Sequence, residues 1–337
     1  MPRSSVNDPP LVPLLRRYTD IGEPLSCRPV TLGLLNRGYR LATTRGAYFL
    51  KHHLDGDHDA ITRQHRATRR LQAVGVPVAP PVEDSGGSTV AVIGGRCFAL
   101  HPWIDGRHRD GAQLTAGQSE RLGSLLGMVH TLLAQVMDPA DRPGGPAPYA
   151  SADPEETFTL IESLLRLTRA ARPRDSFDTL AEHRLLQRRA LLEEHADRRP
   201  PPGRAGCWVH GDFHPLNLLY RGAEPAAIVD WDRLGVQPPA EEAVRAAAIF
   251  FVQPAGQLDL PKVRAYARAY RRAAGADAQE MAAAAHRVWW ERLNDFWILR
   301  WRYELDDRRA DPQFPAVSAL VVWWTREYDA VRDAFAG

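Results

Sequence analysis

Residues 209–232, VHGDFHPLNLLYRGAEPAAIVDWD, carry three polar side chains whose types and spacing could do chemistry. Asn217 follows Asp212 by five residues, and Asp230 comes thirteen residues later, at the end of an apolar run. A loop aspartate can accept or orient the proton of an attacking hydroxyl, while an asparagine and a second aspartate supply the hard oxygen ligands that Mg²⁺ prefers. The pattern Asp-x4-Asn alone occurs by chance in many loops, so it needs support from other parts of the chain.

A lysine far upstream provides such support. The chain has 43 basic residues, of which only Lys51 and Lys262 are lysines. Lys51 ends the apolar stretch GAYFLK, which reads as a strand. One interpretation is a solvated charge at a strand end. The other is a site that needs a compact ammonium on a flexible stem, as a contact to the phosphates of a nucleotide would.

The first hundred or so residues predict a small antiparallel sheet that carries one helix. Residues 28–52 read as three short strands, with a break at Asn36–Gly38 and a tight turn at Arg45–Gly46. Residues 59–74 have one apolar stripe and end at Gly75, which predicts a helix. A hairpin that turns at Gly94–Gly95 completes a five-stranded N-lobe over residues 1–100.

The remaining residues, 101–337, predict a larger and mainly helical C-lobe. Thr115 and Gln118 form a capping box before a long amphipathic helix. Asp153 and Pro154 predict the start of another helix after the Pro/Gly-rich loop 138–156. Helices then run to about residue 197, short extended pieces occupy 206–235, and helices resume to the C-terminus. The predicted fold class is therefore α+β, with two lobes.

The most aromatic stretch, residues 286–305, is predicted to be a single helix. Trp290, Leu293, Trp297 and Trp301 fall on one stripe of it. Core packing is the default interpretation of such a stripe, and a wall against which a substrate stacks is the alternative.

Composition limits the partners. The net charge of +2 is close to neutral, which argues against nucleic acid and against an anionic membrane surface. The sequence has no run of 18 apolar residues and no signal-peptide core at its start. Cys27, Cys97 and Cys207 are scattered and fit reduced thiols, so we expect a cytoplasmic protein.

Together, HGDFHPLNLL, IVDWD and the upstream lysine resemble the aminoglycoside phosphotransferase-like kinases, relatives of the choline and homoserine kinases. The resemblance covers residues 25–330 or so and implies a two-lobe protein-kinase-like fold. It implies Asp212 as the catalytic base, Asn217 and Asp230 as Mg²⁺ ligands, and Lys51 as the phosphate-binding lysine. His210 would then be a structural residue of the loop.

The nucleotide site follows from the same resemblance, with departures. The end of the strand FALHPW would hold adenine through backbone groups near Leu100, His101 and Trp103. The segment LLNRGYRL lacks GxGxxG, so Asn36, Gly38 and backbone amides would cover the phosphates. Gln64 stands where protein kinases place a glutamate for the lysine.

Asp232 has no settled role. It could be a second Mg²⁺ contact or a solvated surface residue, and the second interpretation is slightly favoured. Asp232, Glu241, Glu242 and Asp295 could instead recognise a cationic acceptor.

The implied reaction is transfer of the γ-phosphate of ATP, with Mg²⁺, to a hydroxyl of a small molecule. Such an acceptor could be an aminoglycoside or other antibiotic, a sugar or an amino alcohol. The alternatives are a kinase that acts on Ser or Thr of a peptide, and a catalytically silent pseudokinase, which only Gln64 supports. A metallophosphoesterase is a weak rival because further metal-binding motifs are missing. The absence of an HxxxH pair on one helix argues against a zinc site at His52, His53, His58 and His65.

Overall fold

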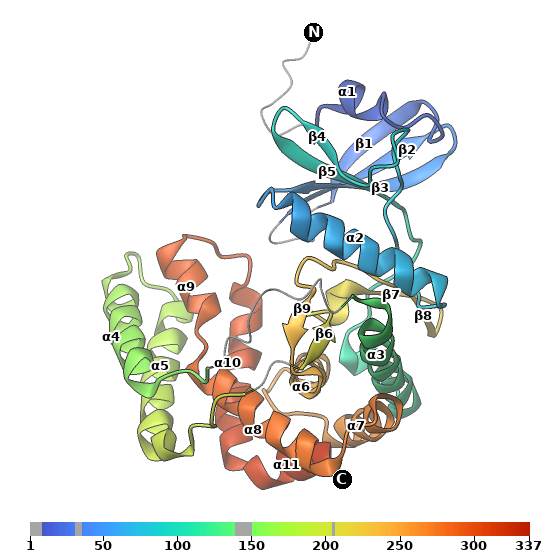
Figure 1. Cartoon of the computed structure of the whole chain (residues 1–337). Helices are drawn as coiled ribbons and strands as arrows, with labels where there is room; N and C mark the ends of the chain where they lie inside the picture. Colours follow the sequence, from blue (N-terminus) through green and yellow to red (C-terminus); the bar gives the residue numbers. More distant parts are fainter. Residues whose placement is uncertain (1–8, 31–35, 139–149, 204–205) are drawn as a thin grey trace.

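A computed structural model describes residues 9–30, 36–138, 150–203 and 206–337. The N-lobe is a five-stranded antiparallel sheet in the order β1-β2-β3-β5-β4. Its elements are α1 (Leu11–Leu15), β1 (Pro24–Val30), β2 (Arg37–Thr43), β3 (Gly46–His53), α2 (His58–Ala73), β4 (Ala91–Ile93) and β5 (Arg96–Pro102). Helix α2 lies between this sheet and the C-lobe (Figure 1).

Two turns of the sheet are where the sequence placed them. Gly46 begins β3 directly after the predicted tight turn, and Gly94 and Gly95 join β4 to β5. Both hairpin glycines have positive φ, 57° and 74°, which side chains rarely adopt. The two turns therefore set the register of β2 with β3 and of β4 with β5. Strand β5 also pairs with β3, where Lys51 stands opposite Ala99.

The two lobes are joined by main-chain contacts as well as by the chain itself. The chain leaves the sheet after Pro102, so the predicted boundary between residues 100 and 101 falls inside β5. Beyond it, the connecting segment is fixed to the C-lobe, because Arg107 and Tyr220 exchange two backbone hydrogen bonds of 2.9 Å. The segment after α2 also reaches the C-lobe, where Ile228 donates its N–H to Pro77 at 2.8 Å.

The C-lobe is mainly helical, as expected, and carries two small β-ribbons, β6–β9 and β7–β8. Its helices are α3 (Ala116–Val136), α4 (Pro154–Ala170), α5 (Ser176–His195), α6 (Pro239–Phe250), α7 (Leu260–Ala274), α8 (Ala278–Asn294), α9 (Trp297–Glu304), α10 (Phe314–Arg326) and α11 (Tyr328–Ala336). Its strands are β6 (Cys207–Val209), β7 (Leu218–Arg221), β8 (Glu224–Ile228) and β9 (Gly235–Gln237). No helix in the described ranges is long and apolar enough to cross a membrane.

The predicted helix starts of the C-lobe are confirmed. Thr115 and Gln118 form the capping box of α3, and Asp153 caps α4 with Pro154 in its first turn. Helix α3 packs closely on α7 because Gly123 leaves room for the main chain: a Cβ there would stand 2.1 Å from the carbonyl oxygen of Tyr266. Part of the predicted loop, residues 139–149, lies outside the described residues.

The single helix predicted over residues 286–305 is wrong. Helix α8 ends at Asn294, and α9 starts at Trp297 after Asp295 adopts an extended conformation. The Asp295 carboxylate accepts the N–H of Trp297 at 3.0 Å and so stabilises the new start. Periodicity could not show the break because the aromatic spacing continues through it.

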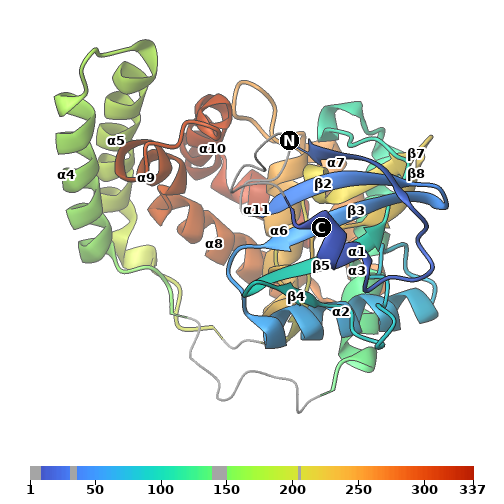
Figure 2. The same cartoon turned by 90° about the horizontal axis from the view of Figure 1, so that it is seen from above.

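Helices α4, α5 and α9 lie together at one side of the C-lobe in both views, next to α10 (Figures 1 and 2). With the start of α10 they enclose a second core, made of Ile161, Leu164, Leu165, Ala181, Leu185, Phe296, Ile298, Leu299, Ala310 and Phe314. The later turns of α10, with Leu320, Val321 and Trp324, pack into the main core of the C-lobe. Trp290 and Leu293 belong instead to the main core of the C-lobe, while Trp297 and Trp301 on α9 are only half-buried. Core packing is thus confirmed for Trp290 and Leu293, and Trp297 packs against the edge of the second core.

Three histidine rings lie together between α2 and the sheet of the N-lobe. The ring centroids of His53 and His65 are 6.1 Å apart, and those of His65 and His101 are 5.5 Å apart. Burial first, and then the charge of nearby Lys51 among other causes, lower the pKa of His53 to about 3, that of His65 to about 2 and that of His101 to about 4. All three rings are therefore neutral in the folded protein at pH 6.

This cluster predicts that the protein loses stability as the pH falls below 6.5. Unfolded histidines take up protons near that pH, whereas these folded rings do not, so protons favour the unfolded chain between about pH 6.5 and pH 4. Each ring contributes up to about 1.4 kcal/mol per pH unit. Urea unfolding at pH 7.5, 6.5 and 5.5 should show the loss, and His53→Leu should reduce its slope.

The control for this measurement is His58→Gln, because His58 is exposed at the start of α2. We expect it to leave the slope unchanged. A free energy of unfolding that stays constant from pH 7.5 to pH 5.5 would contradict the interpretation of the cluster as buried neutral rings.

Candidate active site

The loop between β6 and β7 carries the predicted catalytic aspartate, and its shape depends on Gly211. The φ angle of Gly211 is 84°, and a Cβ at this position would lie 2.0 Å from the carbonyl oxygen of Arg233. A residue with a side chain would force the loop away from the segment that follows Asp232. The glycine that stands in place of the usual arginine of kinase loops is thus required by the close approach of two backbones.

His210 serves this loop as a neutral, hydrogen-bonded ring. Its Nε2 donates to the carbonyl oxygen of Val229 at 3.1 Å, and its Nδ1 accepts the N–H of Asp212 at 3.2 Å. Burial lowers the pKa of His210, although Glu242 opposes the effect. Both ring nitrogens are occupied by the backbone, an arrangement that supports a structural role for this residue.

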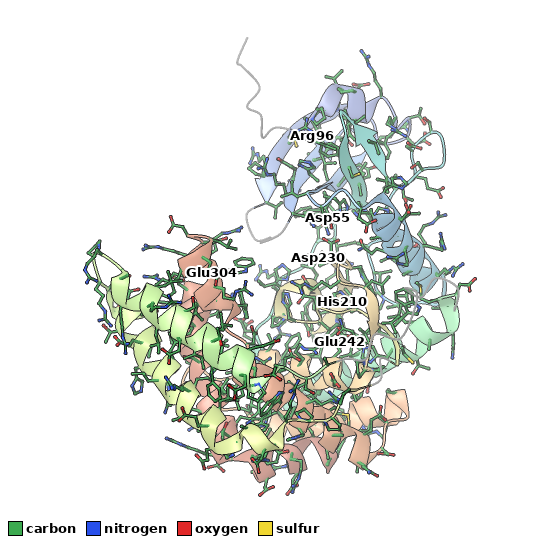
Figure 3. All side chains as sticks on the ribbon, turned by 60° about the vertical axis from the view of Figure 1, so that its left-hand side comes forward. Asp55, Arg96, His210, Asp230, Glu242 and Glu304 are labelled. Atoms are coloured by element: carbon green, nitrogen blue, oxygen red, sulfur yellow. The ribbon has the colours of Figure 1, made fainter. Side chains whose placement is uncertain are left out.

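A buried glutamate of α6 holds the backbone of the same loop. Glu242 is 2% exposed and accepts the N–H groups of His210 and Gly211, at 3.1 Å and 2.5 Å. It also lies 2.7 Å from Nε2 of His130 on α3, whose Nδ1 is 3.0 Å from the hydroxyl of Tyr270 on α7. Burial raises the pKa of Glu242, but the hydrogen bond and charge of His130 outweigh it and lower the pKa. Figure 3 shows Asp230, His210 and Glu242 one below another under the N-lobe.

The prediction that Glu241 and Glu242 recognise a cationic acceptor is therefore wrong. Both side chains are buried, and Glu241 lies 3.3 Å from Arg287 of α8. Sequence reasoning missed the role of Glu242 because two adjacent glutamates in a first helical turn look like ordinary helix-start residues.

Asp212 and Asn217 occupy the two ends of this loop. The side-chain amide of Asn217 donates to the carbonyl oxygen of Asp212 at 2.8 Å, so the amide oxygen is the atom that can serve as a ligand. Burial raises the pKa of Asp212, but His214 at 3.6 Å and Arg233 at 3.8 Å outweigh it and lower the pKa. Asp212 is therefore an anion at neutral pH.

Asp230, two residues after β8 of the C-lobe, contacts a residue of the N-lobe. Its φ angle is 58°, a left-handed conformation that is costly for a residue with a side chain and common at functional sites. Its Oδ1 lies 2.8 Å from Nζ of Lys51, which is 179 residues away in the sequence. Burial raises the pKa of Asp230, but the charge of Lys51 outweighs it and lowers the pKa.

Lys51 also contacts Asp232, whose Oδ1 is 2.5 Å from Nζ. Burial lowers the pKa of Lys51, but the two carboxylates outweigh it and raise the pKa, so the ammonium stays charged. The side chain of Asp232 is 18% exposed, so the interpretation of this residue as a solvated surface group is wrong. Gln64 and Asn36 meet at the same residue: Gln64 donates to the carbonyl oxygen of Asp232 at 2.9 Å, and Asn36 donates to its carboxylate.

The other predicted nucleotide-site residues lie on β2 and along the end of β5. Gly38 stands opposite Lys51 in the sheet, where a Cβ would meet the ring of Phe49 at 2.6 Å. The carbonyl oxygen of Leu100 accepts the N–H of Val82 at 2.7 Å, and Nδ1 of His101 is 2.9 Å from the carbonyl oxygen of Ala79. The Trp103 N–H donates to Ala47 at 3.0 Å.

The residues proposed as Mg²⁺ ligands are Asn217 and Asp230, from two strand ends. In the described ranges, no group of three or more His, Cys, Asp or Glu side chains is arranged to hold a metal ion. Mg²⁺ commonly takes only one or two protein ligands and fills its other positions with phosphate oxygens and water. An asparagine oxygen and a half-exposed carboxylate fit that mode of binding.

Comparison with known proteins places this geometry in a family. A model of the phosphotransferase enzyme family matches residues 26–276. The homoserine kinase of Neisseria meningitidis serogroup B is 26% identical over 228 residues, which cover 68% of this chain and 67% of that protein. These matches and the fold identify a kinase that acts on small molecules.

Two solved structures confirm the predicted two-lobe fold. A spectinomycin phosphotransferase in complex with ADP and spectinomycin has a TM-score of 0.64 and 14% identity, and the match covers 95% of this chain and 98% of that one. A microcompartment-associated aminopropanol kinase has a TM-score of 0.63 and 16% identity, with 96% and 98% covered.

The contacts of Glu242 predict that it positions the catalytic loop. Glu242→Gln leaves one acceptor oxygen for two loop N–H groups, so we expect the free energy of unfolding to fall by about 2 kcal/mol. The displaced loop should lower kcat by about 10²-fold while nucleotide affinity stays within a factor of about two. Urea unfolding, nucleotide titration and steady-state kinetics check these three quantities.

Glu241→Gln is the matched control, because it removes a buried charge from the neighbouring position but touches no loop N–H. It should cost stability and leave kcat unchanged. Equal losses of kcat in the two variants would show that Glu242 has no special role in the loop.

Proposed function

Since the chain belongs to the phosphotransferase enzyme family, we propose that it transfers the γ-phosphate of Mg²⁺-ATP to a hydroxyl of a small molecule. One observation carries the proposal: the lysine of β3 meets Asp230 across the two lobes, at 2.8 Å. That pairing brings the proposed phosphate contact and the proposed metal ligand of a kinase site together.

Bound Mg²⁺ would neutralise charge on the phosphates between Asn217 and Asp230. Among the protein's own groups, Lys51 contacts the phosphates, and Gly38 lets the backbone of β2 approach them. The region near Leu100, His101 and Trp103 would hold the base of the nucleotide. Related solved structures in this fold contain AMP-PNP, ADP or AMP, which supports a nucleotide as the phosphate donor.

Asp212 would orient the acceptor hydroxyl and take its proton at a carboxylate oxygen. Its lowered pKa makes it a weak base, so its main effect before transfer is orientation. This is sufficient for phosphoryl transfer, in which positioning and charge stabilisation supply most of the rate. Glu242 and Gly211 keep the loop in the shape that aims Asp212.

The acceptor is proposed to be a small molecule with a hydroxyl group, such as an antibiotic, a sugar or an amino alcohol. The similar proteins are named for homoserine, spectinomycin, amicoumacin and aminopropanol. A peptide Ser or Thr is the second candidate acceptor. A reaction that consumes ATP also fits the proposed cytoplasmic location. The pseudokinase alternative loses its support, because Lys51 has two carboxylate partners despite Gln64.

The test is release of ADP from Mg²⁺-ATP in the presence of acceptors. The panel holds aminoglycosides, spectinomycin, peptide antibiotics, sugars, homoserine, aminopropanol, choline and Ser-rich peptides. We expect turnover that depends on one small-molecule class, and a loss of about 10²–10⁴-fold in Asp212→Asn with nucleotide binding retained.

Asp329→Asn is the control, because Asp329 is exposed on α11, and it should behave as the wild type. Turnover with Ser-rich peptides alone would favour the second candidate. An Asp212→Asn variant that is as active as the wild type would refute the assignment of the base.

A further inference from the structure

We propose that Asp232 is a positioning residue that holds Lys51 and joins the N-lobe to the catalytic segment. In protein kinases a glutamate of the N-lobe helix pairs with the phosphate-binding lysine. Here that helix offers Gln64, and the carboxylate comes from the C-lobe. The proposal rests on the proposed function for its catalytic meaning, but its structural part can be tested without nucleotide.

The contacts of Lys51 are the first argument. Its side chain is 10% exposed and lies between two carboxylates, with Nζ 2.5 Å from Asp232 and 2.8 Å from Asp230. The Asp230 side chain is 47% exposed, whereas that of Asp232 is 18% exposed. Asp230 therefore faces open space where a ligand can reach it, and Asp232 faces the lysine and the N-lobe.

The second argument is that Asp232 binds three separate parts of the N-lobe. One carboxylate oxygen meets Lys51 of β3, and the other accepts the side-chain amide of Asn36, just before β2. The carbonyl oxygen of Asp232 accepts the Gln64 amide of α2 at 2.9 Å. Asn36 in turn accepts the N–H of Leu54 at 2.9 Å, which ties it to the end of β3. One C-lobe residue thus sets the position of β2, β3 and α2 together.

Charge explains why two carboxylates are needed. If Asp230 turns its oxygens to a metal ion, the poorly exposed ammonium of Lys51 loses one partner. A charge in such a place is costly unless another opposite charge remains beside it. Asp232 supplies that charge from the same strand end. Its two oxygens already accept hydrogen bonds from Lys51 and Asn36, which argues against direct metal binding.

The chain provides an unusual way to test this, because it has only two lysines, Lys51 and Lys262. Lys262 on α7 lies 3.5 Å from Asp259 and donates to the carbonyl oxygen of Gly111 at 2.9 Å. An amine-reactive reagent applied to the protein without nucleotide, followed by peptide mass spectrometry, reads both sites in one sample. Lys262 then serves as an internal reference.

Asp232→Asn should raise the labelling rate of Lys51 relative to Lys262 by about tenfold, the factor that corresponds to one lost charge-assisted hydrogen bond. The matched control is Asp259→Asn, which keeps a good helix cap and should raise labelling of Lys262 only. An unchanged ratio in Asp232→Asn would overturn the proposal. If Asp232→Asn partly unfolds the protein, both lysines will label fast, and Asn36→Ala is then measured instead. In that variant, a higher labelling rate of Lys51 relative to Lys262 supports the proposal, and an unchanged ratio overturns it.

Kinetics then test the catalytic meaning. In Asp232→Asn the KM for ATP should rise about tenfold, while the KM for the acceptor and the Mg²⁺ concentration for half-maximal rate stay near the wild-type values. Asp230→Asn should shift the Mg²⁺ dependence instead. A Mg²⁺ shift in Asp232→Asn as large as in Asp230→Asn would show a metal ligand and overturn the proposal.

The labelling arm needs neither nucleotide nor turnover. Failure of the wild-type protein to use any acceptor would therefore count against the proposed function only. An unchanged labelling ratio in an active enzyme would count against Asp232 only.

Discussion

The arrangement of the two lobes depends on one poorly exposed ammonium that needs negative charge beside it. Lys51 belongs to the sheet of the N-lobe, and both of its carboxylate partners, Asp230 and Asp232, follow the C-lobe strand β8. A charge so far from water is stable only when paired, so the pairing ties the lobes to one relative position. The left-handed backbone at Asp230 is one cost of placing two carboxylates at a single strand end.

In the C-lobe, a second set of contacts holds the tight loop between β6 and β7, which carries Asp212. Gly211 lets the loop approach the backbone of Arg233, and the turn leaves N–H groups that no strand can pair. Glu242 satisfies two of them from inside the protein, and His130 anchors Glu242 in turn. Because every member has a partner, this buried polar network can be rigid without leaving a charge unpaired.

Helices α4, α5 and α9 stand beside this framework and form a second core with the start of α10, whose later turns pack into the main core of the C-lobe. The break at Asp295 separates this group from α8 and leaves Trp297 and Trp301 half-buried, with ring centroids 5.4 Å apart. A group with its own core can change its surface without disturbing the loop or Lys51. This independence agrees with a fold whose similar members are named for several different acceptors.

The sequence alone determined the fold class, the turns and caps, and the candidate residues Lys51, Asp212, Asn217 and Asp230. These depend on local patterns: periodicity, turn-forming glycines, capping residues and fixed spacing within one loop. Only the tertiary structure decided what Asp232 and the glutamate pair of α6 do, and where the aromatic helix breaks. A carboxylate can be stable either in water or beside a buried cation. Which of the two environments it has depends on partners more than a hundred residues away in the sequence.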